Sequence, residues 1–325
     1  MYPFQLKPAT KDYIWGGDRL KHEYGIDSRE AVVAEAWMLS CNGSGASTIK
    51  NGPLAGTTLA DALFADVQKA LGINNPFAVY FPILIKFIDA KDDLSIQVHP
   101  GNGYALENEG EFGKTEMWYV LDAQEGAFLY YGFSHAVARE ELRERIENDT
   151  IIEVLNRVAV NKGDVFFIES GTIHAIGKGI MIAEIQQNSD STYRVYDYNR
   201  TDADGNKREL HIAKALDVID TNFVPGVPVV HAPVMKPGYS ATRLASCIYF
   251  TVDLLSVDSF AELDCDCRSF ASLLFVDGSG SIIFDNREYG EDGLFAVSKG
   301  DSLFLPADTG AYRIEGRCRV LLTVR

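Results

Sequence analysis

The sequence predicts a mainly β protein made of two barrels, with a few helices in its N-terminal part. Gly, Val, Ile, Phe and Tyr are plentiful, and the apolar stretches are short and interrupted by Gly, Asp and Asn, as in strands joined by turns. With 325 residues, the chain has room for about two domains of ~150 residues each. A faint internal repeat relates its two parts and supports two similar barrels.

Three helices are predicted, all before residue 220. In residues 58–71, apolar side chains recur at four-residue spacing between a capping threonine and a following glycine. The second helix, 139–147, is expected to break at Asn148 and to restart at Thr150 with a capping-box pattern. The third covers Leu210–Ile219.

Most of the remaining chain resembles strands. The segments that matter most for function are Pro82–Ile88, Leu94–His99, Glu116–Leu121 and Gly163–Ile168. Between Pro225 and Pro237 the chain contains four prolines and one glycine, which disfavour both a helix and a central strand. We therefore predict a linker there, between a catalytic, metal-binding domain of residues 1–230 and a degenerate C-terminal domain of residues 236–325.

The internal repeat aligns residues 162–174 with residues 299–311 without a gap. Both copies open with Lys-Gly-Asp, a turn that enters a buried strand. The position of His174 in the first copy corresponds to Ala311 in the second, and no histidine follows His231. The C-terminal domain is therefore expected to lack metal ligands of this kind.

Four side chains suit a divalent metal: Gln97, His99, Glu116 and His174. Alternate residues of a strand point to the same face, so Gln97 and His99 are expected to point together. Imidazole, carboxylate and amide oxygen suit a borderline cation, and a few protein ligands leave room for a substrate oxygen. The pattern predicts a metalloenzyme.

Composition excludes several other classes. The net charge of −16 argues against nucleic acid and anionic membranes as partners, because both are polyanions. No apolar stretch looks long enough to cross a bilayer, and the start of the chain lacks a secretory pattern, so we expect a cytoplasmic location. The five cysteines are expected to be reduced thiols.

Local motifs resemble a known family. The spacing from Gly163 to His174 resembles the second half of the cupin signature, although Glu169 stands where proline is usual, and Gln97 replaces the first histidine of the usual His-x-His. Together the motifs resemble the type I phosphomannose isomerases, most closely their short bacterial form, over nearly the whole chain. They are Ile14-Trp-Gly-Gly, Glu35-Ala-Trp37, Leu94-Ser-Ile-Gln-Val-His-Pro100, Gly113-Lys-Thr-Glu-Met-Trp, Gly171-Thr-Ile-His-Ala, and Glu184 followed by Tyr193-Arg194-Val-Tyr-Asp-Tyr.

The resemblance implies one zinc ion per chain and interconversion of mannose 6-phosphate and fructose 6-phosphate through a cis-enediol. The zinc ligands would be Gln97, His99, Glu116 and His174. The resemblance also places Ser95, Lys86 and Lys114 around the sugar phosphate, and Glu184 and Arg194 beside the reacting carbons. Trp15, next to two glycines, is expected to form a pocket wall.

Several roles stay open at this level. Glu184 is the first candidate for the base, and Lys114 and a zinc-bound water are alternatives. Glu184 could instead support a ligand histidine. Lys86 could pair with Asp89, and Arg194 with Asp197 or Asp190. The remaining histidines, His22, His135, His211 and His231, lack ligand spacing and are expected at the surface.

Two other functions also fit parts of the pattern. Two histidines and a carboxylate are the ligand set of non-haem iron enzymes, so a cupin oxygenase is one alternative. A non-catalytic sugar-phosphate-binding cupin is the other, because a fold does not dictate a function. In each case we expect a small-molecule partner and a monomer or weak homo-oligomer.

Overall fold

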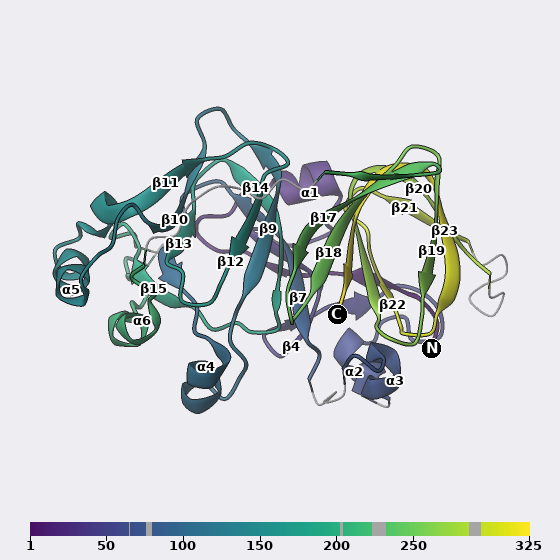
Figure 1. The fold of residues 1–325 in the computed structure, drawn as a ribbon, viewed down its shortest axis with the longest axis horizontal. Helices are drawn as coiled ribbons and strands as arrows, with labels where there is room; N and C mark the ends of the chain where they lie inside the picture. Colours follow the sequence, from purple (N-terminus) through teal and green to yellow (C-terminus); the bar gives the residue numbers. More distant parts are fainter. Residues whose placement is uncertain (65, 76–79, 202–203, 223–231, 286–293) are drawn as a thin grey trace.

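A computed structural model describes residues 1–325 except 65, 76–79, 202–203, 223–231 and 286–293. The protein is mainly β, as predicted, and two β-rich lobes lie side by side (Figure 1). We call them the N-terminal and C-terminal lobes. Closure of each lobe into a barrel stays a prediction, as does the division into residues 1–230 and 236–325. Most of the predicted linker lies outside the described residues.

Two antiparallel sheets form the N-terminal lobe. The six-stranded sheet has the order β12 (Val165–Ile168), β9 (Glu116–Ala123), β14 (Ile180–Gln187), β7 (Ile83–Ala90), β3 (Glu35–Leu39) and β2 (Ala9–Lys11). The five-stranded sheet has the order β11 (Leu155–Ala159), β10 (Phe128–Phe133), β13 (His174–Ile176), β8 (Ile96–Val98) and β15 (Tyr193–Tyr196). A short hairpin pairs β4 (Cys41–Asn42) with β5 (Gly45–Ala46).

The C-terminal lobe contains a ten-stranded sheet. Its main path runs β16 (Val234–Lys236), β17 (Tyr239–Ser246), β18 (Thr251–Val257), β23 (Gly310–Val324), β20 (Ala271–Phe284), β22 (Ser302–Leu305), β1 (Phe4–Lys7) and β6 (Thr48–Ile49). Two further strands pair with it, β19 (Phe260–Cys265) with β23 and β21 (Leu294–Ser298) with β20. Strands β1 and β6 come from the start of the chain, so the N-terminal segment completes the C-terminal sheet.

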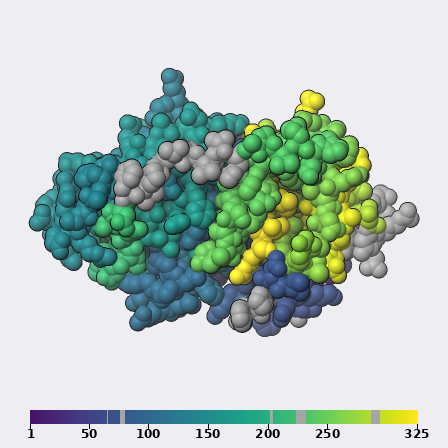
Figure 2. Space-filling model, in the orientation of Figure 1, coloured from purple at the N-terminus to yellow at the C-terminus, as the bar shows by residue number. Residues whose placement is uncertain are grey.

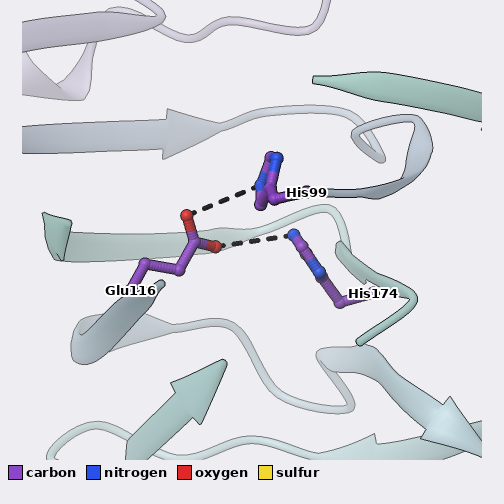
Figure 3. Close-up of side chains that lie close together, drawn as sticks. All are labelled: His99, Glu116 and His174. Carbon is purple, nitrogen blue, oxygen red and sulfur yellow. Dashed lines mark ion pairs between the residues drawn. The ribbon is translucent and has the colours of Figure 1, made fainter. Parts of the chain in front are cut away.

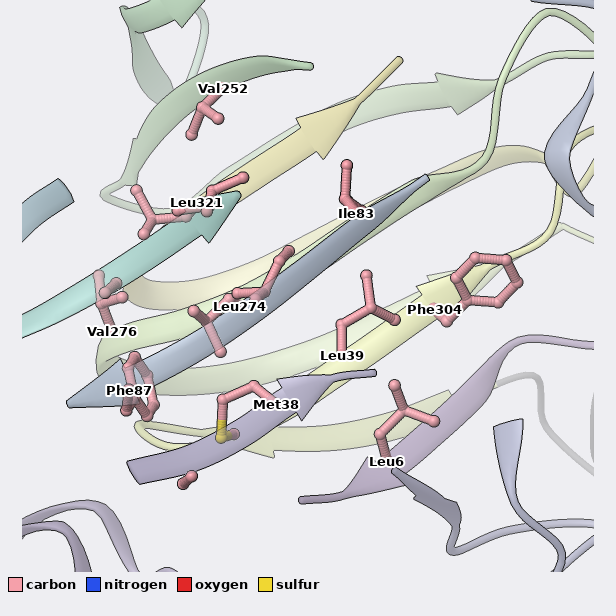
Figure 4. Packing of buried hydrophobic residues seen from close by; sticks show 14 of the residues in the cluster. Leu6, Met38, Leu39, Ile83, Phe87, Val252, Leu274, Val276, Phe304 and Leu321 are labelled. Atoms are coloured by element: carbon pink, nitrogen blue, oxygen red, sulfur yellow. The ribbon is translucent and has the colours of Figure 1, made fainter. Parts of the chain in front are cut away.

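Side-chain alternation gives the six-stranded sheet two different faces. On β7, Ile85 and Phe87 belong to a buried core that also contains Leu274 and Leu321 of the C-terminal lobe. Figure 4 shows side chains of both lobes meeting in this shared core. Lys86 lies between those two residues and therefore points to the opposite face, which carries the polar site.

The helices differ in part from expectation. The predicted helix 58–71 is two short helices, α2 (Leu59–Phe64) and α3 (Val67–Leu71). The Asp66 carboxylate accepts a hydrogen bond from the backbone N–H of Lys69 and so caps α3, as aspartate commonly does at a helix start. Both helices lie at the lower edge of the C-terminal lobe, where Figure 2 shows this segment in blue.

The other two predicted helices occur as α5 (Arg139–Glu147) and α6 (Ile212–Val218). The expected restart at Thr150 is a 3₁₀ turn, Ile151–Val154, and the Thr150 side chain does not cap it. Two helices were not predicted, α1 (Arg19–Tyr24) and α4 (Asn102–Asn108). Both are short, and short segments carry little periodic signal.

The internal repeat corresponds to a shared local structure. Gly163 and Gly300 both have left-handed φ values, 93° and 95°, and each is followed by a four-residue strand, β12 or β22. A residue with a Cβ would be strained at either position, which explains the glycine in both copies. Among the described helices, none is long and apolar enough to cross a membrane.

Candidate metal centre and substrate cavity

One row of side chains crosses the five-stranded sheet. His174 on β13 is the register partner of Gln97 on β8, and Gln97 is the partner of Arg194 on β15. Directly opposed residues of antiparallel strands point to the same face. The register therefore brings together three predicted site residues that are far apart in the sequence.

Another row crosses the six-stranded sheet. Glu184 on β14 is the register partner of Lys86 on β7 and of Trp118 on β9. Two residues further along β14, Gln186 is paired in the same way with Glu116 on β9. Glu116, Glu184 and Lys86 therefore share the polar face of this sheet.

The metal-binding candidates meet between the two sheets. Glu116 faces both histidines, with His99 Nε2 3.5 Å from its Oε2 and His174 Nε2 3.5 Å from its Oε1 (Figure 3). One possible ligand atom from each of the three lies within 4.8 Å of the others. The Gln97 amide is 3.4 Å from His174 Nε2, and its nitrogen and oxygen exchange places by rotation.

These atoms fit a metal ion better than a hydrogen-bonded core. His99 Nε2 and both carboxylate oxygens of Glu116 are buried, and none makes a hydrogen bond of good geometry among the described residues, although Lys114 Nζ lies 3.2 Å from Glu116 Oε2. Unpartnered buried polar atoms are costly, so atoms that converge on one point indicate a missing ligand. The Nδ1 atoms contact backbone carbonyls, His99 that of Ser191 and His174 that of Thr172, both at 2.9 Å. These contacts fix the protonated Nδ1 tautomer and leave Nε2 free to coordinate.

Local electrostatics favour the same interpretation. Burial, with the nearby Lys114, holds the pKa of His99 well below its usual value, and burial lowers that of His174 to about 4. Both imidazoles are therefore neutral at physiological pH, as metal ligands must be. Burial and the nearby Glu184 raise the pKa of Glu116 to about 8 without a cation. A bound divalent ion would stabilise the charged carboxylate instead.

Lys86 lies in a buried charge cluster. Its Nζ is 3.4 Å from Glu35 Oε2 and 3.3 Å from Glu184 Oε2, and its side chain is only 5% exposed. Burial alone would lower the pKa of Lys86, but Glu35 and Glu184 outweigh it and raise this pKa. Asp89, considered above as a partner, instead accepts a hydrogen bond from the backbone N–H of Arg19.

Glu184 has partners on both sides. Its Oε1 accepts a hydrogen bond from Trp118 Nε1 at 3.0 Å, and its Oε2 faces Lys86. Burial would raise the pKa of Glu184, but Lys114, Lys86 and the indole donor outweigh it, so the pKa is lowered. Glu184 is therefore an anion at neutral pH. Lys114 shares the same face, as its spacing predicts, and its Nζ is 3.2 Å from Glu116 Oε2.

A polar cavity of about 300 Å³ opens beside these residues. All the predicted substrate and catalytic residues line it: Trp15, Lys86, Ser95, Lys114, Glu184 and Arg194. Gln97 also lines it, whereas His99, Glu116 and His174 are 0–1% exposed. The structure thus gathers the predicted residues into one site, although their roles remain predictions.

Sequence reasoning missed other residues of this cavity. They are Tyr13, Glu35, Asp190, Thr192, Arg208 and His211. The expectation that His211 is an ordinary surface residue was wrong, because its side chain is 24% exposed and faces the cavity. Only Glu35 had a signal in the sequence, as part of the Glu35-Ala-Trp37 motif. No motif pointed to the others as cavity residues, although His211 lies in the predicted helix Leu210–Ile219.

The two cavity arginines differ in their partners. Asp197 Oδ1 lies 2.5 Å from both Arg200 and Arg208, so Arg208 is held at the cavity by an ion pair. The structural alternative for Arg194, a pair with Asp197 or Asp190, is not formed. Among the described residues, the Arg194 guanidinium makes no hydrogen bond or ion pair, and it stays available to an anionic ligand.

Comparisons with known proteins agree with this site. The family model "Phosphomannose isomerase type I, catalytic domain" matches residues 3–126, and "Mannose-6-phosphate isomerase, cupin domain" matches residues 240–324. A probable mannose-6-phosphate isomerase of Bacillus subtilis is 38% identical over 99% of both chains. The mannose-6-phosphate isomerase of Streptococcus mutans is 39% identical over 98% of this chain and 97% of its own. A crystal structure of the Bacillus subtilis mannose 6-phosphate isomerase superposes with a TM-score of 0.90, at 35% identity over 99% of both chains.

Proposed function

The chain belongs to the type I phosphomannose isomerase family, and from that premise we propose that it interconverts mannose 6-phosphate and fructose 6-phosphate in the polar cavity. The catalyst in this proposal includes one zinc ion per chain, with Gln97, His99, Glu116 and His174 as ligands. Bound there, a divalent cation supplies Lewis-acid stabilisation of the negative charge that develops on the C1 or C2 oxygen of the sugar.

One observation carries the proposal more than any other. Buried atoms of His99 and Glu116 that make no good hydrogen bond within the described residues converge directly beside a cavity whose lining includes four cations, Lys86, Lys114, Arg194 and Arg208. A sugar phosphate brings a dianion and several oxygens, which match cationic side chains and a metal at one end of the same space. Lys86, Lys114 and Arg208 each also pair with a carboxylate, whereas Arg194 has no such partner among the described residues.

Glu184 is the proposed proton carrier between C1 and C2. Its lowered pKa makes it an anion that can accept a proton at neutral pH. Its neighbours also oppose this role, because Trp118 and Lys86 stabilise the anion and reduce its basicity. Lys114 remains the alternative, with its Nζ near Glu116 and inside the cavity lining.

Arg194 is proposed to stabilise the enediolate as charge moves onto the sugar oxygens. Its guanidinium is half-buried and unpartnered among the described residues, so no local carboxylate neutralises its charge. A positive charge fixed in a partly dry site stabilises a developing anion more than the same charge would in water. The planar fork can also contact two oxygens at once.

The phosphate is proposed to bind near Lys86, Ser95 and Lys114, which supply binding energy remote from the reacting carbons. All three line the cavity, which supports the assignment. The two carboxylates beside Lys86 offset much of its charge, so Lys114 and Ser95 are the stronger candidates. A cytoplasmic location and a monomer or weak homo-oligomer remain part of the proposal.

The decisive experiment is a coupled assay with mannose 6-phosphate, combined with elemental analysis of the purified protein. We expect turnover, about one divalent metal per chain, loss of activity on chelation and recovery on adding zinc. Oxygen consumption with bound iron would instead favour the oxygenase alternative. Tight binding of the sugar phosphate without turnover would favour a non-catalytic binding protein.

A further inference from the structure

The backbone around Lys114 is held by three successive amide hydrogen bonds. The N–H of Gly113 donates to the side-chain oxygen of Asn102 at 2.9 Å, and that of Lys114 donates to the carbonyl of Pro100 at 3.0 Å. The N–H of Thr115 donates to the side-chain oxygen of Gln187 at 2.9 Å. Two of these three acceptors are side chains, so amino-acid substitution can remove them without changing the backbone.

The two side chains are linked to each other and to the C-terminal lobe. Gln187 Nε2 donates to the side-chain oxygen of Asn102 at 3.0 Å. Asn102 Nδ2 then donates to the phenolic oxygen of Tyr249 at 3.2 Å. Tyr249 lies in the turn between β17 and β18 and packs against the core shared by both lobes. A continuous chain of hydrogen bonds thus runs from the C-terminal lobe to both sides of Lys114.

We propose that Tyr249 is a positioning residue for Lys114 and that it acts through the side chain of Asn102. The inference rests on the proposed function, because it assumes that Lys114 works in the substrate cavity. The second lobe, which has no metal-ligand cluster among its described residues, would then contribute to the site by fixing one of its cations.

Close backbone packing couples the position of the Lys114 segment to the position of Asn102. A Cβ added to Gly113 would lie 2.6 Å from the backbone nitrogen of Asn102 and 2.7 Å from the carbonyl oxygen of Pro100. The two backbones are therefore in close contact, and a shift of Asn102 has to move the Lys114 segment. The Lys114 side chain is only 5% exposed, so its Nζ cannot readjust freely in solvent.

The Asn102 side chain, in contrast, borders an open space. Tyr249, Asn102 and Gln187 all line a second cavity, of about 180 Å³, together with Phe112 and Arg325. Close packing therefore does not hold Asn102 on this side, and hydrogen bonds orient its amide: Gly113 and Gln187 bond its oxygen, and Tyr249 bonds its nitrogen from the C-terminal lobe. Loss of the hydroxyl would let the Asn102 amide rotate, which would weaken both bonds to its side-chain oxygen.

The test is Tyr249→Phe, which removes only the hydroxyl. Loss of one neutral hydrogen bond should lower kcat/KM for mannose 6-phosphate by roughly twofold to tenfold, with metal content unchanged and only a small drop in the thermal unfolding temperature. The matched control is Tyr239→Phe in the same lobe, because within the described residues the Tyr239 hydroxyl has no hydrogen bond. The control should behave as wild type.

A double-mutant cycle with Lys114→Met separates positioning from general damage. If Tyr249 acts through Lys114, Tyr249→Phe should have almost no effect in the Lys114→Met background. An equal fold-loss in both backgrounds, or wild-type kcat/KM in Tyr249→Phe, would overturn the proposal.

Amide hydrogen exchange provides a readout that needs no turnover. Tyr249→Phe should speed exchange at Gly113 and Thr115, while Tyr239→Phe should not. Unchanged exchange at both amides would also overturn the proposal. Failure of the proposed function has a different signature, namely a wild-type protein that does not isomerise mannose 6-phosphate whatever the exchange rates are.

Discussion

The Lys86 ammonium lies between two buried carboxylates, and replacing this residue is the sharpest test of the charge cluster. Lys86→Met keeps most of the side-chain volume and removes the charge. The Glu35 and Glu184 carboxylates would then face each other across the space that the ammonium had filled. Removing one member of a buried ion pair costs about 3–5 kcal/mol, because the remaining charge is left unpaired in a poorly solvated place.

The structure adds two opposing contributions to this cost in unfolding free energy. Both carboxylates keep an indole donor, Glu35 from Trp37 at 2.7 Å and Glu184 from Trp118 at 3.0 Å. These hydrogen bonds reduce the loss of stability. The loss is increased because Lys86→Met leaves two carboxylates without a cation, whereas breaking a simple ion pair leaves one unpaired charge. We therefore expect a loss of about 3–5 kcal/mol in the free energy of unfolding, accompanied by a higher pKa of Glu184.

Urea unfolding at a fixed metal concentration measures the effect, since bound metal itself adds stability. The matched control is Lys214→Met, whose ion pair with Glu109 is 2.7 Å long but 43% exposed on the lysine side. Such a surface pair should cost no more than about 1 kcal/mol. The double variant Lys86→Met/Glu35→Gln should recover part of the loss. A Lys86→Met protein no less stable than the control would refute the reasoning.

Three other substitutions test separate parts of the site. His174→Ala should lose the metal, as measured by elemental analysis, while circular dichroism stays that of a folded β protein; full metal occupancy would contradict the ligand assignment. Glu184→Gln should retain the metal but turn over about two to four orders of magnitude more slowly, and solvent exchange of the C2 proton at the wild-type rate would exclude Glu184 as the base. Burial would raise the pKa of Asp197, but Arg208 and Arg200 outweigh it and lower this pKa. Its stabilisation is therefore present above the unfolded value of about 3.9 and is lost as the pH falls through the lower folded value. Asp197→Asn should be less stable than wild type at pH 7 and should lose less stability on acidification; parallel stability curves for the two proteins would argue against this ion pair.

The local patterns of the sequence predicted local structure well. Alternation along the extended segments at β8 and β9 placed Gln97 with His99 and Lys114 with Glu116, although His99 and Lys114 lie just outside the two strands. The Lys-Gly-Asp repeat predicted two equivalent turns, and the left-handed glycines at both places explain why. The four-residue period from 58 to 71 predicted helix correctly. It did not show that the segment divides into two helices, because the division depends on Asp66, which caps the start of the second helix.

Long-range pairing was beyond the reach of these patterns. Glu184 meets Lys86 through a strand register that joins residues about a hundred positions apart, and no local signal encodes that register. For this reason Asp89, close in sequence, was considered as the partner of Lys86. The cavity position of His211 was also missed. The absence of metal-ligand spacing led us to expect a surface residue, but that spacing does not show whether the start of a helix lines a cavity.

The position of β1 has a consequence for synthesis. Phe4 pairs with Phe304, so β1 meets its β22 neighbour only after the following 300 residues have been translated. At about 5–20 residues per second, that interval is roughly 15–60 s. Strand β6 covers one edge of β1 early, through Leu6 and Ile49, while the other edge keeps its hydrogen-bonding groups unpaired. During that time the unpaired edge of β1 can form hydrogen bonds with a wrong strand. We therefore expect folding of this protein in the cell to depend more on chaperones than folding of a protein whose neighbouring strands are consecutive in sequence.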